Sequence, residues 1–241
     1  MNSRIFRRCA HRLAVFDGRF GSGADLLRAF VALTGCLVMC GSAWGIDGAE
    51  VIRRLQARFE DMGSLSARFE RRHFWKLVDQ TQEIKGRLYV QRPDRFRFET
   101  KIQTVVTDGV TVWNYDSANE QVVISRYESS KDDQSQEKLL FDLILLGDYS
   151  DRYAPHYAGE ARVDRKSCHL VALDARQDET YISQIRLWVD RDRWLVRQVE
   201  YRNINDDVTT YALSDLKTGK KLKATRFRFD PPDGIEVVDL R

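Results

Sequence analysis

The sequence predicts a mainly β protein in which a helix is followed by one large curved sheet or barrel. Three observations lead to this prediction. Apolar and polar residues alternate along most of the chain, which is the period of a strand with one face turned inward. Asp, Asn and Gly separate the alternating runs at short intervals. After residue 45, only two segments, near residues 50 and 140, depart from this alternation, so we expect eleven or twelve strands.

The first departure predicts a helix over residues 47–62. Asp47, with Glu50 three residues later, resembles a capping box in which Asp replaces the usual Ser or Thr. Gly63 is a natural stop for the helix. The apolar stripe expected to face the core consists of Val51, Ile52, Leu55, Phe59 and Met62.

The strands are predicted from the alternating runs that begin at Leu65. The tetrapeptide Arg-Phe-Arg-Phe occurs twice, at 95–98 and 226–229, and both copies are predicted to be half-buried strands. Turns are expected at 108–109, 117–119, 190–193, 203–207 and 217–220. The predicted strands cover residues 64–75, 83–92, 95–99, 103–109, 111–116, 121–127, 156–164, 167–175, 181–190, 194–203, 207–216 and 223–230.

The second departure is the segment Leu139–Leu146, in which Asp142 alone interrupts the apolar residues. Its length suits two helical turns and is far too short to span a bilayer. An element that is apolar on all sides must be covered on several sides. It is either a helix that fills a core or a lid over an apolar cavity.

Residues 1–45 are predicted to be a signal peptide. Basic residues precede the apolar run Ala29–Cys40, and small residues flank Trp44 at a suitable export cleavage site, so we place cleavage after Gly45. Residues 46–241 then form a single domain. The alternative is acylation of Cys36 in "LTGC", which would give an anchored protein.

Composition excludes several classes of function. The formal charge is +3, but six of the 39 basic and two of the 36 acidic residues lie in residues 1–45, which leaves 33 and 34. The remainder therefore carries no field that would attract nucleic acid. Cys168 is left as the single cysteine after residue 45, and it is expected to be a buried structural thiol that points away from His169.

Catalytic and cofactor motifs are missing from the sequence. It contains no G-x-S-x-G, H-E-x-x-H, C-x-x-C, phosphate-binding loop or dinucleotide fingerprint, and the histidines follow no metal-ligand spacing. We therefore expect neither an enzyme nor a cofactor or metal, although a catalytic set assembled from distant strands stays an alternative. A partly closed sheet with an apolar concave face favours binding of apolar ligands.

Several blocks are similar to the periplasmic lipoprotein carrier family, LolA. They are "SLSARFE", "GRLYVQRPDRFRFE", "VVTDGVTVWNYD" and the terminal "FRFDPPDGIEVVDL", and the similarity runs from about Ala49 to Asp239. The resemblance implies an incomplete antiparallel barrel of about eleven strands covered by short helices. It also implies a monomeric periplasmic carrier without stable membrane insertion.

The family function implies the partners and the site. The cargo would be acylated lipoproteins, received from an inner-membrane ABC-type releasing complex and passed to an outer-membrane acceptor. By position, Arg92 before Pro93 would latch the lid, and Phe96 would lie near the cavity mouth. The residues expected to line the cavity are Phe59, Phe69, Leu88, Val90, Phe96, Phe98, Trp113, Leu140, Phe141, Ile144, Leu145, Phe227 and Phe229.

Two alternatives remain within this fold. One is an outer-membrane-anchored receptor similar to LolB, which would carry an acylated Cys36. The other is a carrier of another lipid or glycolipid. Family members commonly have glutamine after the phenylalanine of the first strand, where this chain has Glu70, and this departure concerns the cargo interface more than the fold.

Overall fold

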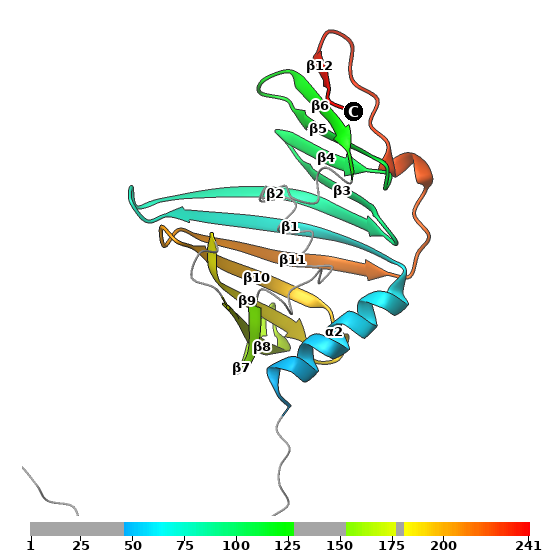
Figure 1. Ribbon diagram of the computed structural model, residues 1–241. Coiled ribbons are helices and arrows are strands. Elements are labelled where there is room, and N and C mark those ends of the chain that lie inside the picture. The colour runs from blue at the N-terminus through cyan, green and yellow to red at the C-terminus, as the bar shows by residue number, and fades with distance from the viewer. Residues whose placement is uncertain (1–45, 128–152, 177–180) are drawn as a thin grey trace, which may run out of the picture. The chain divides into compact units, whose positions relative to one another are not determined.

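The computed structural model describes residues 46–127, 153–176 and 181–241, all within one compact unit that spans Gly45–Arg241 (Figure 1). The predicted signal peptide and the segment Leu139–Leu146 lie outside the described residues. The described part consists of the helix α2 (Gly48–Met62), a short 3-10 helix η2 (Ala224–Phe227) and twelve strands. The mainly β class predicted from the sequence is therefore confirmed.

Helix α2 begins and ends where its sequence predicts. The Asp47 carboxylate accepts a hydrogen bond from the backbone N–H of Glu50 at 2.7 Å, and Gly63 ends the helix with a φ of 63°. The carboxylate of Glu50 does not complete a capping box, because it binds Arg53 and Arg54 instead. The buried stripe is Val51, Leu55, Phe59 and Met62, with Ile52 partly buried beside it.

All twelve strands belong to one open sheet in the order β12-β6-β5-β4-β3-β2-β1-β11-β10-β9-β8-β7. Neighbouring strands are antiparallel except for β12 and β6, which are parallel. The strands are β1 (Ser64–Trp75), β2 (Gln80–Gln91), β3 (Arg95–Thr100), β4 (Gln103–Thr107), β5 (Thr111–Asp116), β6 (Gln121–Arg126), β7 (Tyr153–Val163), β8 (Lys166–Ala175), β9 (Ile182–Asp190), β10 (Val196–Asn203), β11 (Val208–Thr218) and β12 (Glu236–Asp239).

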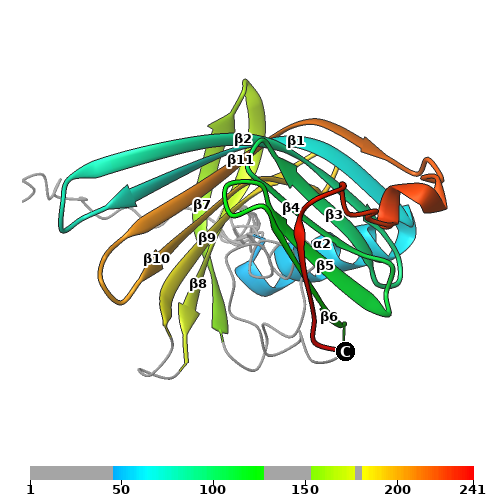
Figure 2. The ribbon, with the colours of Figure 1, turned by 90° about the horizontal axis from the view of Figure 1, so that it is seen from above.

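Strand β1 joins the two halves of the sheet. It pairs with β2 on one side and with β11 on the other, so the meander β1–β6 and the meander β7–β11 share a single hydrogen-bonded sheet. The edges of the sheet are β7 and β12, and the sheet is therefore not closed into a barrel. Figure 2 shows the sheet as an arch with α2 on its concave side.

The inner face of the sheet carries the hydrophobic core. Buried residues of α2 join alternate residues of strands from both halves, including Phe69, Leu173 and Leu213, in one cluster. At its N-terminal end α2 approaches β7 closely, because a Cβ atom on Gly48 would lie 2.8 Å from the carbonyl carbon of His156. A larger residue at this position would push the helix off the strand.

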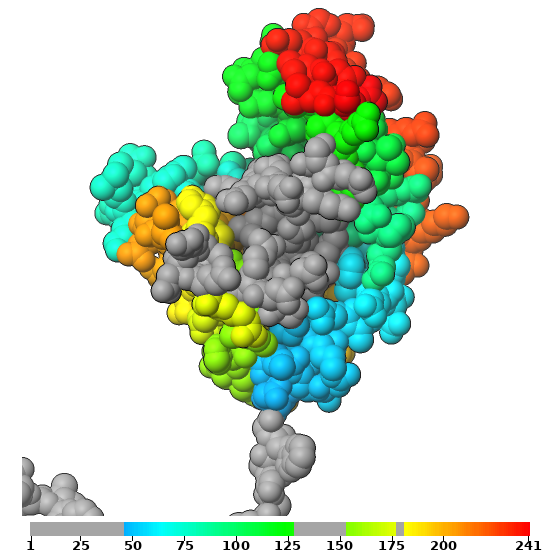
Figure 3. Space-filling model, in the orientation of Figure 1, coloured from blue at the N-terminus to red at the C-terminus, as the bar shows by residue number. Residues whose placement is uncertain are grey.

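The prediction for the C-terminal segment is wrong. Residues 226–229 do not form a strand: η2 ends at Phe227 and extended chain follows, and β12 lies farther on at Glu236–Asp239. The guanidinium of Arg97 donates to the backbone carbonyls of Arg226 and Arg228, at 3.4 and 3.3 Å. In Figure 3 the C-terminal segment (red) packs against the green strands of the first half. Here the alternating residues end a 3-10 helix and begin extended chain that lies with one side against the protein, so alternation of sequence alone does not prove that a segment is a strand.

Candidate functional site: the inner face of the sheet

Six of the predicted cavity residues meet on the inner face. They come from α2 and from the three consecutive strands β1, β2 and β3, and each is at most 8% exposed. Register explains the grouping, because Leu88 lies opposite Phe98 and Val90 lies opposite Phe96, and cross-strand partners share one face of a sheet. The six residues are Phe59, Phe69, Leu88, Val90, Phe96 and Phe98.

A glycine allows the two central aromatic rings of this face to stack. The rings of Phe69 and Phe98 lie nearly parallel, with centroids 4.7 Å apart. Gly86 lies between them on β2, and a Cβ atom there would be 2.3 Å from the ring of Phe69 and 2.4 Å from the carbonyl oxygen of Glu99. Gly86 opens the "G-x-L-x-V-x-R-P" block, so this glycine provides the space that the ring of Phe69 occupies.

Arg92 lies at the end of β2, beside the C-terminal end of α2. It is exposed, and its backbone N–H donates to the carbonyl of Gly63 at 3.0 Å. Its guanidinium lies 5.6 Å from the centroid of the Phe59 ring, a cation–π contact with the helix. The bond between Arg92 and Pro93 is cis. Within the described residues, the guanidinium of the residue predicted to be a latch therefore contacts α2 through the ring of Phe59.

Three predicted cavity residues lie on the opposite, outer face, and this part of the prediction is corrected. Trp113 lies opposite Val106 on β4 and Ile124 on β6, and cross-strand partners share one face. Both partners are buried but do not belong to the inner-face cluster, so all three residues lie on the outer face. Phe227 is fully buried, and the ring of Phe229 lies against Tyr115 with centroids 5.2 Å apart. The four remaining candidates lie outside the described residues: Leu140, Phe141, Ile144 and Leu145.

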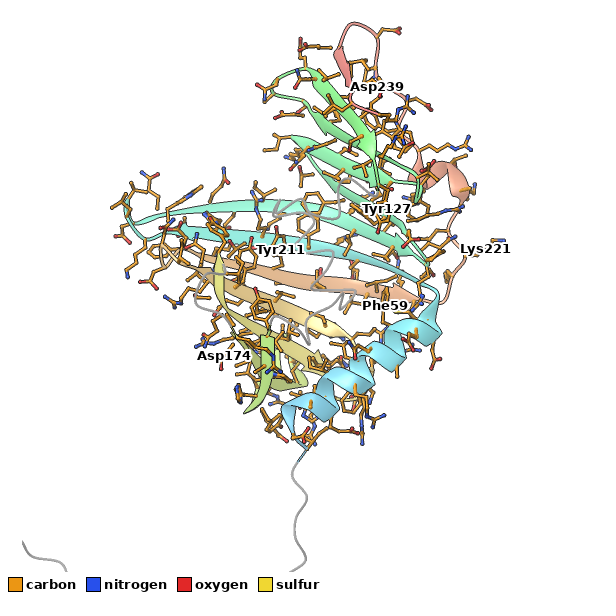
Figure 4. The ribbon with its side chains drawn as sticks, in the orientation of Figure 1. Phe59, Tyr127, Asp174, Tyr211, Lys221 and Asp239 are labelled. Carbon is orange, nitrogen blue, oxygen red and sulfur yellow. The ribbon has the colours of Figure 1, made fainter. Side chains whose placement is uncertain are left out.

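The prediction missed the second half of the inner face. Its signal was present in the alternation of runs such as "YISQIRLWVD", whose inward positions are buried from Ile182 onward. Figure 4 labels Tyr211 on β11 and Phe59 on α2, two separated points of the same cluster. The additional buried residues from this half include Tyr153, Val171, Leu173, Ile185, Leu187, Val199, Tyr201, Tyr211 and Leu213.

Two buried histidines add polar groups to this face. His73 Nδ1 lies 2.6 Å from the hydroxyl of Thr209. His169 lies 3.2 Å from the hydroxyl of Tyr157, and its ring stacks on Trp194 with centroids 5.3 Å apart. Burial lowers the pKa of both imidazoles below the ordinary value of histidine, so both rings are neutral at pH 7. Each is a satisfied hydrogen-bonding group within an apolar surface.

Cys168 and His169 point to opposite faces of β8, as the sequence predicts. Cys168 is fully buried, and burial raises the pKa of its thiol. It is opposite Asp190, which forms a buried ion pair with Arg197 at 2.9 Å. This cluster lies on the outer face, and a protonated, inaccessible thiol is not a nucleophile. Among the described residues no group of His, Cys, Asp and Glu could hold a metal ion.

The fold and this face define a class of protein: one built on a single open, mainly antiparallel sheet, with an apolar inner face and a helix across it. Residues 60–230 match the model of the family described as outer membrane lipoprotein carrier protein LolA. The match covers more than half of the chain, so the chain belongs to this family. Within the described residues, no helix is long and apolar enough to cross a membrane.

Individual relatives agree with this assignment. The chain is 26% identical over 208 residues to an outer-membrane lipoprotein carrier protein of Aeromonas salmonicida, across 85% of this chain and 95% of that one. It is 27% identical over 194 residues to the protein of the same name from Chromohalobacter salexigens, across 79% and 86%. A crystal structure of an uncharacterized conserved protein from Thermus thermophilus shares the fold, with a TM-score of 0.53, 14% identity and coverage of 79% and 98%.

Proposed function

We propose that this protein is a periplasmic carrier that binds the acyl chains of lipoproteins and moves them from the inner to the outer membrane. It is exported with residues 1–45 as a signal peptide, which is cleaved after Gly45, and residues 46–241 form the carrier domain. An inner-membrane ABC-type complex supplies the cargo and an outer-membrane acceptor takes it. The protein performs no covalent chemistry in this scheme.

The observation that carries this proposal is the extent of the apolar inner face. It runs without a break from Phe59 on α2 through Phe69 and Phe98 to the strands of the second half. A sheet that is open at both edges can separate from its covering elements without losing its ladder hydrogen bonds. Such a face suits acyl chains, since each methylene removed from water contributes about 0.8 kcal/mol.

A long acyl chain that is tightly buried would be released slowly. We propose that Arg92 speeds its release. Its guanidinium lies over Phe59 and its backbone joins Gly63, so it links the end of β2 to the end of α2. Cargo that enters beneath α2 competes with this contact. The contact therefore stabilises the closed form relative to the loaded one and promotes handover.

Transfer of a lipoprotein to acceptor vesicles tests this mechanism. Arg92→Leu removes the cation and should leave cargo bound to the carrier for longer, with handover slowed several-fold. Arg87→Leu is the matched control, because Arg87 is an exposed arginine on the same strand but on the outer face. Equal handover rates in the two variants would reject the role of Arg92.

Mass spectrometry of the protein purified after export tests the carrier function itself. We expect copurifying lipoprotein and a polypeptide that begins at Ile46. Phospholipid or glycolipid in place of lipoprotein would identify a carrier of another lipid. A polypeptide that begins at an acylated Cys36 would identify an anchored receptor.

A further inference from the structure

One end of the sheet displays four large apolar side chains to solvent. Leu77 and Val78 in the β1–β2 turn are 96% and 56% exposed, Ile204 in the β10–β11 turn is 63% exposed, and Tyr181 before β9 is 51% exposed. The two turns lie side by side in Figures 1 and 3. Scattered exposed apolar residues are ordinary, but a group at one end of a molecule marks a contact surface. We call these four residues the turn cluster.

Hydrogen bonds hold the turn cluster in place. The backbone N–H of Lys76 donates to Asp207 Oδ1 at 3.0 Å, which joins the two turns. Asn203 Nδ2 donates to the hydroxyl of Tyr181, and the N–H of Ile204 donates to its carbonyl, both at 3.0 Å. Because the turns are fixed to one another, the four side chains are presented together with little further loss of entropy on binding.

The cations that flank the turn cluster are already paired, and the exposed Asp79 beside Val78 adds a negative charge. Lys76 forms an ion pair with Asp206, which also accepts from Arg202 at 3.3 Å, and Arg72 pairs with Glu83 at 2.9 Å. The described residues here therefore present no positive field toward nucleic acid or anionic lipid. Contact at this end depends on apolar burial rather than on charge.

The shape of the cluster selects the partner. Its side chains project from the ends of two hairpins, so a rigid protein would need a matching groove for each turn, whereas a bilayer surface deforms to admit them. Trp75 and Tyr181 lie at the base and the edge, and these residue types favour the membrane–water interface. We propose that this end contacts the lipid bilayer, reversibly, by placing Leu77, Val78 and Ile204 among the lipid headgroups and upper acyl chains.

This contact goes beyond carriage of cargo, because it sets how the protein meets a membrane. Strand β1 runs from Ser64, close to Arg92, to Trp75 beside the turn cluster. The membrane contact and the Arg92–Phe59 contact are therefore at opposite ends of the same strand. Variants at the two ends can be interpreted independently.

Flotation with neutral phosphatidylcholine vesicles tests the proposal. The double variant Leu77→Asp/Ile204→Asp is compared with Ile102→Asp/Val110→Asp, which changes two exposed apolar residues, 49% and 73% exposed, in the β3–β4 and β4–β5 turns. We expect the wild type and the control to bind equally at low and high salt, since apolar insertion is not screened. The turn-cluster variant should lose at least about tenfold in partitioning.

A fluorescent probe locates the contact. An environment-sensitive dye is attached to Leu77→Cys and, as reference, to Val110→Cys, while the fully buried Cys168 stays unlabelled. We expect a blue shift with vesicles at position 77 only. No shift at 77, or equal shifts at both positions, would overturn the proposal. A shift that grows with protein concentration in the absence of vesicles would also overturn it and assign the cluster to a second copy of the chain.

Binding of a soluble acylated peptide to the same samples separates this proposal from the carrier function. The turn-cluster variant should bind the peptide as the wild type does. Absence of peptide binding in the wild type would reject the carrier function and leave the vesicle result to be judged by itself.

Discussion

The two copies of Arg-Phe-Arg-Phe have the same sequence and different structures. Residues 95–98 form part of β3, with both phenylalanines on the inner face. Residues 226 and 227 end η2 and residues 228 and 229 continue as extended chain on the outer face, with Phe227 buried and Phe229 against Tyr115. The backbone of the first copy pairs with the neighbouring strands β2 and β4. The second copy accepts hydrogen bonds from the guanidinium of Arg97, a residue of the first copy, at two of its backbone carbonyls. Alternation therefore determines which side chains of a copy are buried. The contacts with the rest of the chain determine on which face of the sheet they are buried.

The largest expected effects come from one phenylalanine of each copy. Phe98 is 2% exposed and Phe227 is fully buried, so Phe98→Ala and Phe227→Ala should each lower the free energy of unfolding by about 3–5 kcal/mol. Only Phe98→Ala should also weaken binding of an acylated peptide, because only Phe98 lies on the inner face. Urea unfolding and peptide titration measure the two effects. Weaker binding by folded Phe227→Ala would show that the outer face also contributes to the site.

Gly86 provides the second test. It leaves room for the ring of Phe69, which stacks on Phe98 of the first copy. Gly86→Ala places a methyl group against the Phe69 ring and the backbone of Glu99. We expect a loss of about 1–3 kcal/mol in urea unfolding, as for other overpacked sites. Phe69→Leu in the same background should recover part of this loss. No recovery would mean that the backbone contact alone causes it.

Arg97 links the copies and gives the third test. Arg97→Met keeps an unbranched apolar stem but removes the guanidinium that donates to the carbonyls of Arg226 and Arg228 and contacts Glu99. We expect a loss of about 1–2 kcal/mol, since bonds from charged donors are stronger than neutral ones but these are long. Limited proteolysis should show faster cleavage between Gly219 and Gly234. Unchanged cleavage would mean that Phe227 alone retains the segment.

Most of the fold could be predicted because its determinants are local. Asp47 and Gly63 set the ends of α2, and turn residues such as Gly109, with a φ of 96°, separate the strands. Strand β12 was missed because it pairs in parallel with β6, more than a hundred residues earlier. Strand β6 was predicted from its own alternation, but a pairing of that range leaves no local signal in the four residues Glu236–Asp239.

The site was less predictable than the fold for a related reason. Leu88, Val90 and Phe96 could be grouped because alternation on adjacent strands fixes which residues share a face. Trp113 was grouped with them by its apolar character, but the face of a residue beyond a turn depends on register. Trp113 is opposite Val106, whose own partner is the outward Arg97. The cross-strand pairing, rather than the hydrophobicity of the side chain, therefore places Trp113 on the outer face.

The smallest effect is expected at Arg226, the first residue of the second copy. Its guanidinium lies 4.2 Å from the centroid of the Tyr89 ring, on the outer face of β2, and the residue is exposed. Arg226→Ala should cost about 0.5–1 kcal/mol in urea unfolding, the range of an exposed cation–π contact. Arg228→Ala is the matched control, because Arg228 is an exposed arginine of the same copy that contributes only its carbonyl to Arg97. Equal losses would show that the contact between Arg226 and the Tyr89 ring makes no specific contribution to holding the segment.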